Sequence, residues 1–187
     1  MIMTRLYAKY QKEIVPSLRE KFGYPNILAV PKVSKVTVNV GVGKFVKEPG
    51  FLESVEKTLR QITGQAPVKT KAKQSISSFK IRQGMVVGFK VTLRRQRMYD
   101  FIDKLINVTL PRTRDFRGLS TDAVDGQGNF NIGFAEHIAF PEVQDDGIAK
   151  IHGLEVCLTT TAKNKTEGLG LLRLMGFPFK SKEKKSK

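Results

Sequence analysis

Apolar residues recur along the chain with two different periods, one typical of helices and one typical of strands. Near the N-terminus, five of them follow one another every fourth position: Leu6, Tyr10, Ile14, Leu18 and Phe22. This is the spacing of one helix face. Pro16 lies inside the run, where it can kink or split a helix. The pattern predicts a helix over residues 6–22.

Three further segments have helical spacing. The first begins near Pro49 and is closed by Gly64, residues suited to the two ends of a helix. The last begins with Asn164 and Glu167, spaced as a capping box, and stops at Gly176. The apolar positions of the three helices are Phe51, Leu52, Val55, Leu59 and Ile62, then Met98, Phe101, Ile102, Leu105 and Ile106, then Leu171, Leu172 and Met175.

Strict alternation marks the strands. Residues 35–40 and 87–94 each alternate apolar with polar positions, and shorter apolar patterns at residues 130–134 and 154–158 predict two more strands. Strands with one apolar face and helices between them indicate an α+β fold. We expect a two-layer sandwich, with a mainly antiparallel or mixed sheet, helices on one face and the other face open.

The net charge of the chain indicates which kind of partner it binds. Among its 187 residues, 33 Lys and Arg oppose 17 Asp and Glu, giving a net charge of +16 and a pI near 10.1. Such an excess favours a polyanionic partner, with nucleic acid ahead of an anionic membrane surface. No stretch approaches the roughly 20 apolar residues of a membrane span, and the N-terminus lacks the apolar centre of a signal peptide. We expect a cytoplasmic protein.

The charge is unevenly distributed. Residues 67–84 hold five cations and no acid, and their Ser, Thr and Gly content predicts an extended, mobile basic loop. Residues 118–155 hold seven acids against Lys150 alone, so this acidic arm should avoid nucleic acid. Residues 180–187 form a basic tail, expected to be disordered until it meets phosphate. The prediction is one α+β domain over residues 1–179, followed by that tail.

The open sheet face carries the candidate nucleic-acid contacts. Its outward residues, Lys35, Thr37 and Asn39 from one strand and Lys90, Thr92 and Arg94 from another, include no acid. Alternating polar residues can simply face water, but two such strands favour binding to phosphates, 2′-hydroxyls and base edges. The face also lacks aromatic rings on which single-stranded bases could stack. Folded RNA is therefore the favoured target.

Signs of catalysis or metal binding are weak. The glycines at 41 and 43 precede Lys44, but a phosphate-binding loop would need glycine in place of Val38 and a hydroxyl residue in place of Phe45. They instead indicate a strand end that something approaches closely. The single cysteine, Cys157, forms no internal disulfide and is expected to be a small buried strand residue. The two histidines and nearby Glu match no metal-ligand spacing, so no metal or cofactor is expected.

Several motifs resemble those of the bacterial large-subunit ribosomal protein five family, and they follow one order along nearly the whole chain. They are Val-Pro-Lys at 30–32, Val-Asn-Val-Gly-Val-Gly at 38–43, Ile-Thr-Gly-Gln at 62–65, Lys-Ala-Lys-Gln-Ser-Ile at 71–76, Gly-Phe-Lys-Val-Thr-Leu-Arg at 88–94, Arg-Asp-Phe-Arg-Gly at 114–118, Gly-Phe-Ala-Glu-His-Ile-Ala-Phe-Pro-Glu at 133–142 and Leu-Leu-Arg-Leu-Met-Gly-Phe-Pro-Phe at 171–179. The chain departs from the family pattern at two places. Gln74 stands where the family often has lysine, which would weaken a phosphate contact. The basic tail is longer than the family usually carries.

The resemblance implies a non-enzymatic constituent of the large ribosomal subunit that binds 5S ribosomal RNA and helps attach it, among large-subunit RNA and neighbouring proteins. The implied 5S contacts are Asn39, Gln65 and Thr92, with Lys90 and Arg94, beside Lys35 and Thr37 from the alternation. A basic loop would reach the transfer RNA in the peptidyl site, through Lys71, Lys73, Gln74, Ser75, Ser77, Lys80 and Arg82. The acidic arm would bridge to a small-subunit head protein, through Glu136, His137, Glu142, Asp145 and Asp146. No homo-oligomer and no membrane partner are expected.

Two other classes of protein share part of this profile. A DNA-binding regulator would have the charge, but the chain shows no helix-turn-helix or zinc-finger pattern. An RNA-modifying enzyme would need a cofactor loop or a catalytic constellation, and neither is apparent. Membrane-surface binding is disfavoured because the cations lie on strands and a loop rather than along one amphipathic helix.

Overall fold

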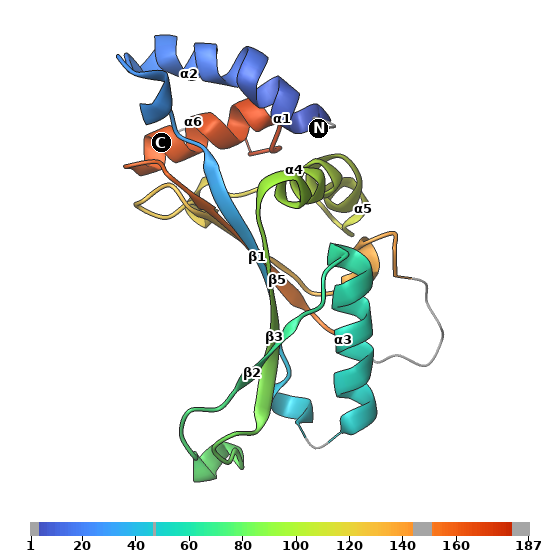
Figure 1. Cartoon of the computed structure of the whole chain (residues 1–187). Coiled ribbons are helices and arrows are strands. Elements are labelled where there is room, and N and C mark those ends of the chain that lie inside the picture. The colour runs from blue at the N-terminus through green and yellow to red at the C-terminus, as the bar shows by residue number, and fades with distance from the viewer. Residues whose placement is uncertain (1–3, 47, 144–150, 181–187) are drawn as a thin grey trace, which may run out of the picture. The chain divides into compact units, whose positions relative to one another are not determined.

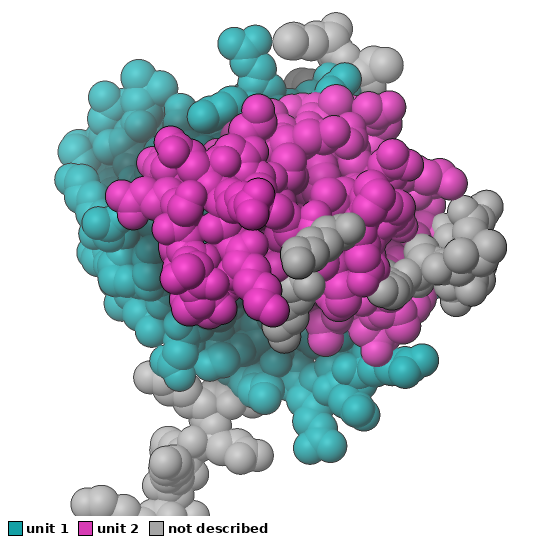
Figure 2. All heavy atoms as spheres, turned by 90° about the horizontal axis from the view of Figure 1, so that it is seen from below, with its two compact units in different colours: residues 1–35, 94–131, 158–187 teal, residues 36–93, 132–157 magenta. Residues whose placement is uncertain are grey.

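The computed structural model describes residues 4–46, 48–143 and 151–180. Contacts divide the chain into two compact units, shown in two colours in Figure 2. Unit 1 comprises residues 1–35, 94–131 and 158–187, and unit 2 comprises residues 36–93 and 132–157. The single domain expected over residues 1–179 stays a prediction. Most of the expected tail, residues 181–187, lies outside the described residues.

Within the described residues, five strands form one sheet in the order β2-β3-β1-β5-β4. Their bounds are β1 Val33–Gly41, β2 Val68–Lys71, β3 Val86–Leu93, β4 Phe130–Phe134 and β5 Leu154–Thr160. β3 pairs antiparallel with both β1 and β2. The α+β class and the antiparallel sheet expected from the alternation are confirmed.

The register between β1 and β3 explains why their alternation gave a reliable prediction. Val36 lies opposite Leu93, Val38 opposite Val91, and Val40 opposite Phe89. All six side chains are 0–1% exposed. Because neighbouring strand residues point to opposite faces, this register collects the apolar side chains on one face and the polar ones on the other.

In unit 2, helix α3 (Pro49–Thr63) covers the apolar face, with Val55, Leu59 and Ile62 buried. It ends at Gly64, whose left-handed φ of 64° allows its N–H to donate to the carbonyl of Arg60. Figure 1 shows α3 along one side of these strands. No helix in the described part of unit 2 lies along their other side, so the expected open face is present there.

The helices of unit 1 contain two π-helical segments with a common cause. One continuous helix runs through α1 (Arg5–Lys9), η1 (Tyr10–Ile14) and α2 (Val15–Phe22), and another through α4 (Arg95–Lys104), η5 (Leu105–Thr109) and α5 (Leu110–Arg112). In each helix the residue before a proline, Val15 or Leu110, donates to the carbonyl five positions back. The following proline has no N–H to continue the ladder. Pro16 therefore shifts the hydrogen bonding without ending the helix.

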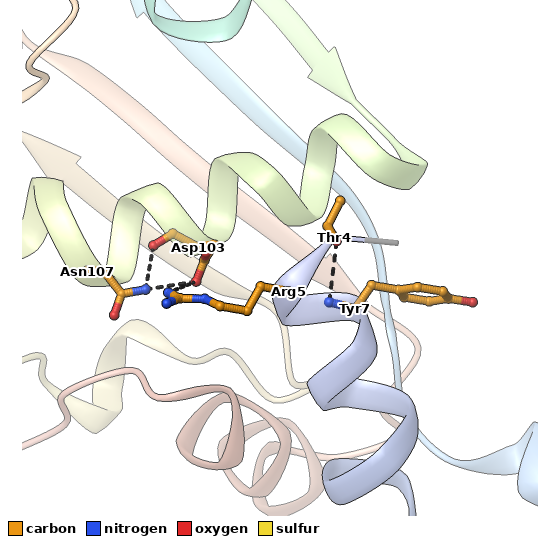
Figure 3. A network of polar contacts seen from close by, with 5 residues as sticks. All are labelled: Thr4, Arg5, Tyr7, Asp103 and Asn107. Atoms are coloured by element: carbon orange, nitrogen blue, oxygen red, sulfur yellow. Dashed lines mark hydrogen bonds and ion pairs between the residues drawn. The ribbon is translucent and has the colours of Figure 1, made fainter. Parts of the chain in front are cut away.

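A polar cluster links the first of these helices to the second within unit 1 (Figure 3). Arg5 of α1 donates to the carboxylate of Asp103 on α4 at 3.0 Å. Asn107, one turn further along, donates to the same carboxylate at 2.8 Å and to the carbonyl of Asp103 at 2.9 Å. Thr4 caps α1 by accepting from the N–H of Tyr7 at 3.4 Å. Arg5 is exposed and Asp103 half-buried, so this ion pair is expected to add little to the stability of the unit.

The last helix of unit 1 begins and ends where the sequence predicted. Helix α6 spans Lys165–Met175, and the Asn164 side chain accepts from the N–H of Glu167 at 2.9 Å. Glu167 in turn accepts from the N–H of Lys163 at 3.0 Å, one residue earlier than in a standard capping box. The helix ends at Gly176, whose left-handed φ of 104° is a conformation that glycine adopts without strain.

One prediction is wrong in part. Residues 67–84 were expected to form an extended, mobile basic loop, but Val68–Lys71 form strand β2, which pairs with β3. The polar sequence of β2 lacks a buried face, with only Thr70 half-buried, so it has no alternation to reveal it. Short 3-10 turns complete the described elements: Ile27–Ala29, Gly43–Phe45, Ser77–Phe79, Thr121–Ala123 and His137–Ala139. None of the described helices is both long and apolar enough to cross a membrane.

Candidate nucleic-acid interface

Four of the predicted contacts come together on unit 2 and form what we call the polar sheet face: Thr37, Asn39, Lys90 and Thr92. Thr37 lies directly opposite Thr92, and Asn39 directly opposite Lys90. Lys90 is exposed and the other three are half-buried. Opposed residues on one face have Cβ atoms about 5 Å apart, so these side chains form one continuous set of donors and acceptors. No hydrogen bond or ion pair ties their side chains to other described residues.

The polar sheet face continues toward β2 with little side-chain bulk. Gly41 lies opposite Gly88, and Thr70 of β2 lies beside Gly88. A Cβ on Gly88 would meet Thr70 Oγ1 at 2.8 Å and the carbonyl oxygen of Val40 at 2.9 Å. A Cβ on Gly41 would meet nothing within 4 Å. The close approach of β1 and β2 to β3 therefore requires glycine at position 88. The space above Gly41, by contrast, is not filled by any described residue.

Gln65 has a position that the sequence did not predict. It follows the end of α3 and donates from Nε2 to the carbonyl oxygen of Thr92 at 3.3 Å. β2 begins only at Val68, opposite Lys90, so the Gln65 side chain pairs with β3 beyond the end of β2. Gln65 is thus adjacent to Thr92, and its side-chain amide donates to the sheet backbone.

Lys35 and Arg94 belong to unit 1. Arg94 is exposed and donates to the carbonyl oxygen of Ser34 at 3.4 Å, which holds it near Lys35. Their predicted contact with RNA stays a prediction.

Residues 72–85 form a second candidate surface, which we call the basic hairpin. Ala72 accepts from the N–H of Gly84 at 3.0 Å and donates to the carbonyl of Met85 at 2.8 Å. Nearer the tip, Ile76 and Ile81 exchange both backbone hydrogen bonds, at 2.9 and 3.2 Å. All the residues predicted to contact transfer RNA are exposed on it or at the adjoining end of β2: Lys71, Lys73, Gln74, Ser75, Ser77, Lys80 and Arg82.

One cation of the basic segment is used within the chain. Lys69 on β2 forms an ion pair with Glu56 of α3 at 3.0 Å. Its Cα lies opposite Phe89, so Lys69 points to the helix-covered face and away from the polar sheet face. The charge count along the sequence did not distinguish it from its neighbours.

The predicted acidic arm is divided between the two units. Asp122 and Asp125 lie in unit 1, where Asp122 pairs with Lys165 at 3.5 Å. Asp125 accepts from Asn129 Nδ2 at 2.9 Å, and hydrogen bonding from Asn129 lowers its pKa. Glu136 and Glu142 lie half-buried in unit 2. The predicted contacts Asp145 and Asp146 lie outside the described residues.

His137, also predicted for this arm, is buried against His152. The two residues are 4% and 7% exposed, and their rings stack with centroids 4.2 Å apart and an interplanar angle of 8°. His152 donates its backbone N–H to His137 Nδ1 at 3.2 Å, and Phe51 packs edge-on against His152. Burial, aided by the neighbouring His137, lowers the pKa of His152 to about 4. The stacked rings thus connect residue 137 to residue 152. Because the His137 side chain is buried, a partner protein would contact exposed residues around it rather than His137 itself.

The described residues offer neither a metal-ligand cluster nor a thiol of lowered pKa. They contain no group of three or more His, Cys, Asp or Glu placed to hold a metal ion. Cys157 lies in strand β5 as expected, but it is half-buried rather than buried. Burial, and next the neighbouring Glu155, raise the pKa of its thiol. A thiol that stays protonated is a poor nucleophile.

Comparison with known proteins gives matches over most of the chain. The family model described as ribosomal protein L5 matches residues 26–82, and the model for the C-terminus of the same ribosomal family matches residues 86–179. A large ribosomal subunit protein uL5 from Caldanaerobacter subterraneus subsp. tengcongensis is 52% identical over 177 residues, covering 95% of this chain and 99% of the relative. A uL5 from Syntrophomonas wolfei is 53% identical over 178 residues, covering 95% and 100%.

The fold and the interface thus define a basic α+β protein with an open polar sheet face and an exposed basic hairpin. The two family models together match most of the chain, over residues 26–82 and 86–179. The chain belongs to the ribosomal protein L5 family. It is a structural, non-enzymatic component of the large ribosomal subunit and serves translation.

Proposed function

We propose that the polar sheet face of unit 2 binds 5S ribosomal RNA and helps attach it to the large subunit. The observation that carries this proposal is the register that puts Thr37, Asn39, Lys90 and Thr92 side by side with no acid among them. Two hydroxyls, an amide and an ammonium can together contact phosphates, 2′-hydroxyls and base edges. The face has no aromatic ring, which favours folded RNA recognised by its shape.

The open space above Gly41 supports the same proposal. Glycine inside a strand costs stability relative to alanine, by roughly 0.5–1 kcal/mol. Nothing described near Gly41 requires that glycine, because an added Cβ would meet no atom within 4 Å. A bare backbone beside Asn39 lets a nucleic-acid strand approach the sheet closely.

Two substitutions should distinguish general affinity for RNA from specificity for 5S ribosomal RNA. Lys90→Ala should weaken binding to many RNAs alike and reduce the salt dependence by about one phosphate contact. Asn39→Ala should cost roughly 1–3 kcal/mol, mainly with 5S ribosomal RNA. Filter-binding titrations over a range of salt, with Lys12→Ala as a charge-matched control, measure both. Identical salt profiles for the Lys90 and Asn39 variants would refute this division.

We also propose that the basic hairpin contacts the transfer RNA in the peptidyl site. Its exposed cations and hydroxyls, with no acid from residue 67 to 85, support this role. Because Gly84 donates to Ala72 across the base of the hairpin at 3.0 Å, residues 73–83 can be replaced by a short Gly-Ser turn without breaking β2. Ribosomes with this replacement should release peptidyl-site transfer RNA faster, while the isolated protein keeps its affinity for 5S ribosomal RNA. Loss of 5S binding would show that the hairpin is misassigned.

A third contact, a bridge to a small-subunit head protein through the acids of the segment 136–146, is proposed on charge alone. Acidic side chains on a basic chain provide a complementary surface for a basic ribosomal protein. Glu136→Lys should weaken association of the two subunits, measured by light scattering against magnesium concentration. Unchanged association would remove this residue from the bridge.

A further inference from the structure

The basic hairpin exposes a large aromatic side chain at its tip. Phe79 is 70% exposed at the end of the turn Ser77–Phe79, and Ile76 beside it is 45% exposed. Leaving a phenyl ring in water forgoes the free energy of burying it. Lys80 follows Phe79 directly and Arg82 comes two residues later, and residues 67–85 contain no acid.

The backbone holds this tip in a defined shape. Ile76 and Ile81 exchange two hydrogen bonds below the turn, and the N–H of Lys80 donates to the carbonyl of Ser77 at 3.0 Å. Lys80 adopts a left-handed φ of 54°, a conformation that glycine or asparagine adopts at lower cost. This conformation turns the chain at Lys80, whose side chain is exposed at the tip.

A hollow of about 920 Å³ lies beside the turn. Its lining combines hydroxyls, cations and an apolar part: Ser75, Ser77, Lys80, Ile81, Arg82 and Met85. Ser75 Oγ already accepts from the N–H of Gln83 at 2.9 Å, so its hydroxyl proton is free to point to a partner. Such a lining suits a sugar-phosphate strand, with cations for the phosphates and hydroxyls for the sugar.

We infer that Phe79 stacks on an exposed base of the RNA that the basic hairpin meets, while the hollow holds the adjoining sugar-phosphate backbone. This inference rests on the proposed contact between the hairpin and transfer RNA. An exposed aromatic ring on a basic segment, here Phe79 followed by Lys80 and Arg82, is the arrangement used to stack bases without sequence preference. A protein partner is disfavoured because a hairpin with this many cations and no acid has few complementary groups for an ordinary protein surface.

Substitutions at Phe79 separate stacking from general apolar contact. Ribosomes carrying Phe79→Tyr should release labelled peptidyl-site transfer RNA at the wild-type rate, because the flat ring is kept. Phe79→Ala and Phe79→Leu should both release it about tenfold faster, because leucine is apolar but cannot stack. Since the ring is 70% exposed, none of these changes disturbs the core, and Ile151→Ala, at a 57% exposed site in unit 2, is the matched control.

Each other outcome overturns a stated part of the account. If Phe79→Leu behaves as wild type and Phe79→Ala does not, Phe79 makes an apolar contact, as with a protein partner, and stacking is refuted. If all Phe79 variants match wild type while replacement of residues 73–83 speeds release, the hairpin contacts transfer RNA without stacking. If that replacement also changes nothing, the proposed hairpin function itself fails.

A spectroscopic test is available because the chain has no tryptophan. Phe79→Trp places a single indole at the tip of the full-length protein bound to 5S ribosomal RNA. Transfer RNA, added at concentrations where its own label reports binding, should quench this indole and leave the Ile151→Trp control unchanged. Bound transfer RNA without quenching of the indole at position 79 would refute the stacking contact.

Discussion

The stacked histidines of unit 2 should make the protein lose stability in weak acid, and His152 should be the main cause. His152 is 7% exposed, and its Nε2 has no hydrogen-bond partner among the described residues. Its Nδ1 lies 3.3 Å from the carbonyl oxygen of Gly153, so the neutral ring with its proton on Nδ1 is favoured. Protonating Nε2 would place a charge against His137 in a buried site without a partner.

The expected loss follows from the two pKa values. The folded protein holds the pKa of His152 at about 4, below the ordinary value of 6.5. As pH falls from 6.5 toward 4, the unfolded chain takes up a proton that the folded chain does not, so the free energy of unfolding decreases over that window. The full difference corresponds to about 3 kcal/mol, and the part reached at pH 5 to about 2 kcal/mol.

Urea unfolding of the full-length protein at pH 7.5 and pH 5, at fixed ionic strength, measures this loss. His152→Phe keeps a flat ring against His137 and Phe51 but removes the titrating group. This variant should lose about 2 kcal/mol less than wild type between the two pH values. Asp125, whose pKa is lowered from 3.8, loses its contribution only below this range. If wild type and His152→Phe lose the same free energy, His152 is not the acid-sensitive group.

Three further substitutions test packing and the interface. Gly88→Ala should destabilise the protein by more than about 1 kcal/mol in urea unfolding, because its Cβ would meet the backbone carbonyl oxygen of Val40 at 2.9 Å, whereas Gly133→Ala, with nothing within 4 Å, should not. Gly41→Ala should leave stability unchanged or slightly raised but lower affinity for 5S ribosomal RNA in filter binding, and unchanged affinity would mean that no strand lies close to it. Asn164→Ala should cost about 1 kcal/mol in thermal unfolding by removing the cap of α6, and a cost near zero would contradict that role.

The sequence predicted those elements whose signal is local. The valines of β1 and the apolar residues of β3 alternate because one face is buried, and α3 and α6 carry their own end signals at Gly64 and Asn164. β2 gives no such signal. It is a short polar strand that exists because β3 offers an edge with which to pair.

The candidate site was predictable as far as it depends on alternation. The outward positions of β1 and β3 follow from the pleat, and the structure adds that Asn39 and Lys90 are direct cross-strand neighbours. The roles of Lys69 and His137 depend on partners distant in the chain, Glu56 and His152. Composition does not show which distant residues lie side by side in the fold. Lys69 was therefore counted with the unpaired cations of the basic loop, and His137 was predicted to contact a partner protein.

The most direct test of the central claim is amine footprinting of the full-length protein with and without 5S ribosomal RNA. Lys90 is exposed at the centre of the polar sheet face, whereas Lys12 and Lys163 are exposed in unit 1. We expect 5S ribosomal RNA at saturation to protect Lys90 from acetylation at least several-fold more than it protects Lys163. Equal acetylation of Lys90 in the free protein and in the saturated complex would contradict binding through the polar sheet face.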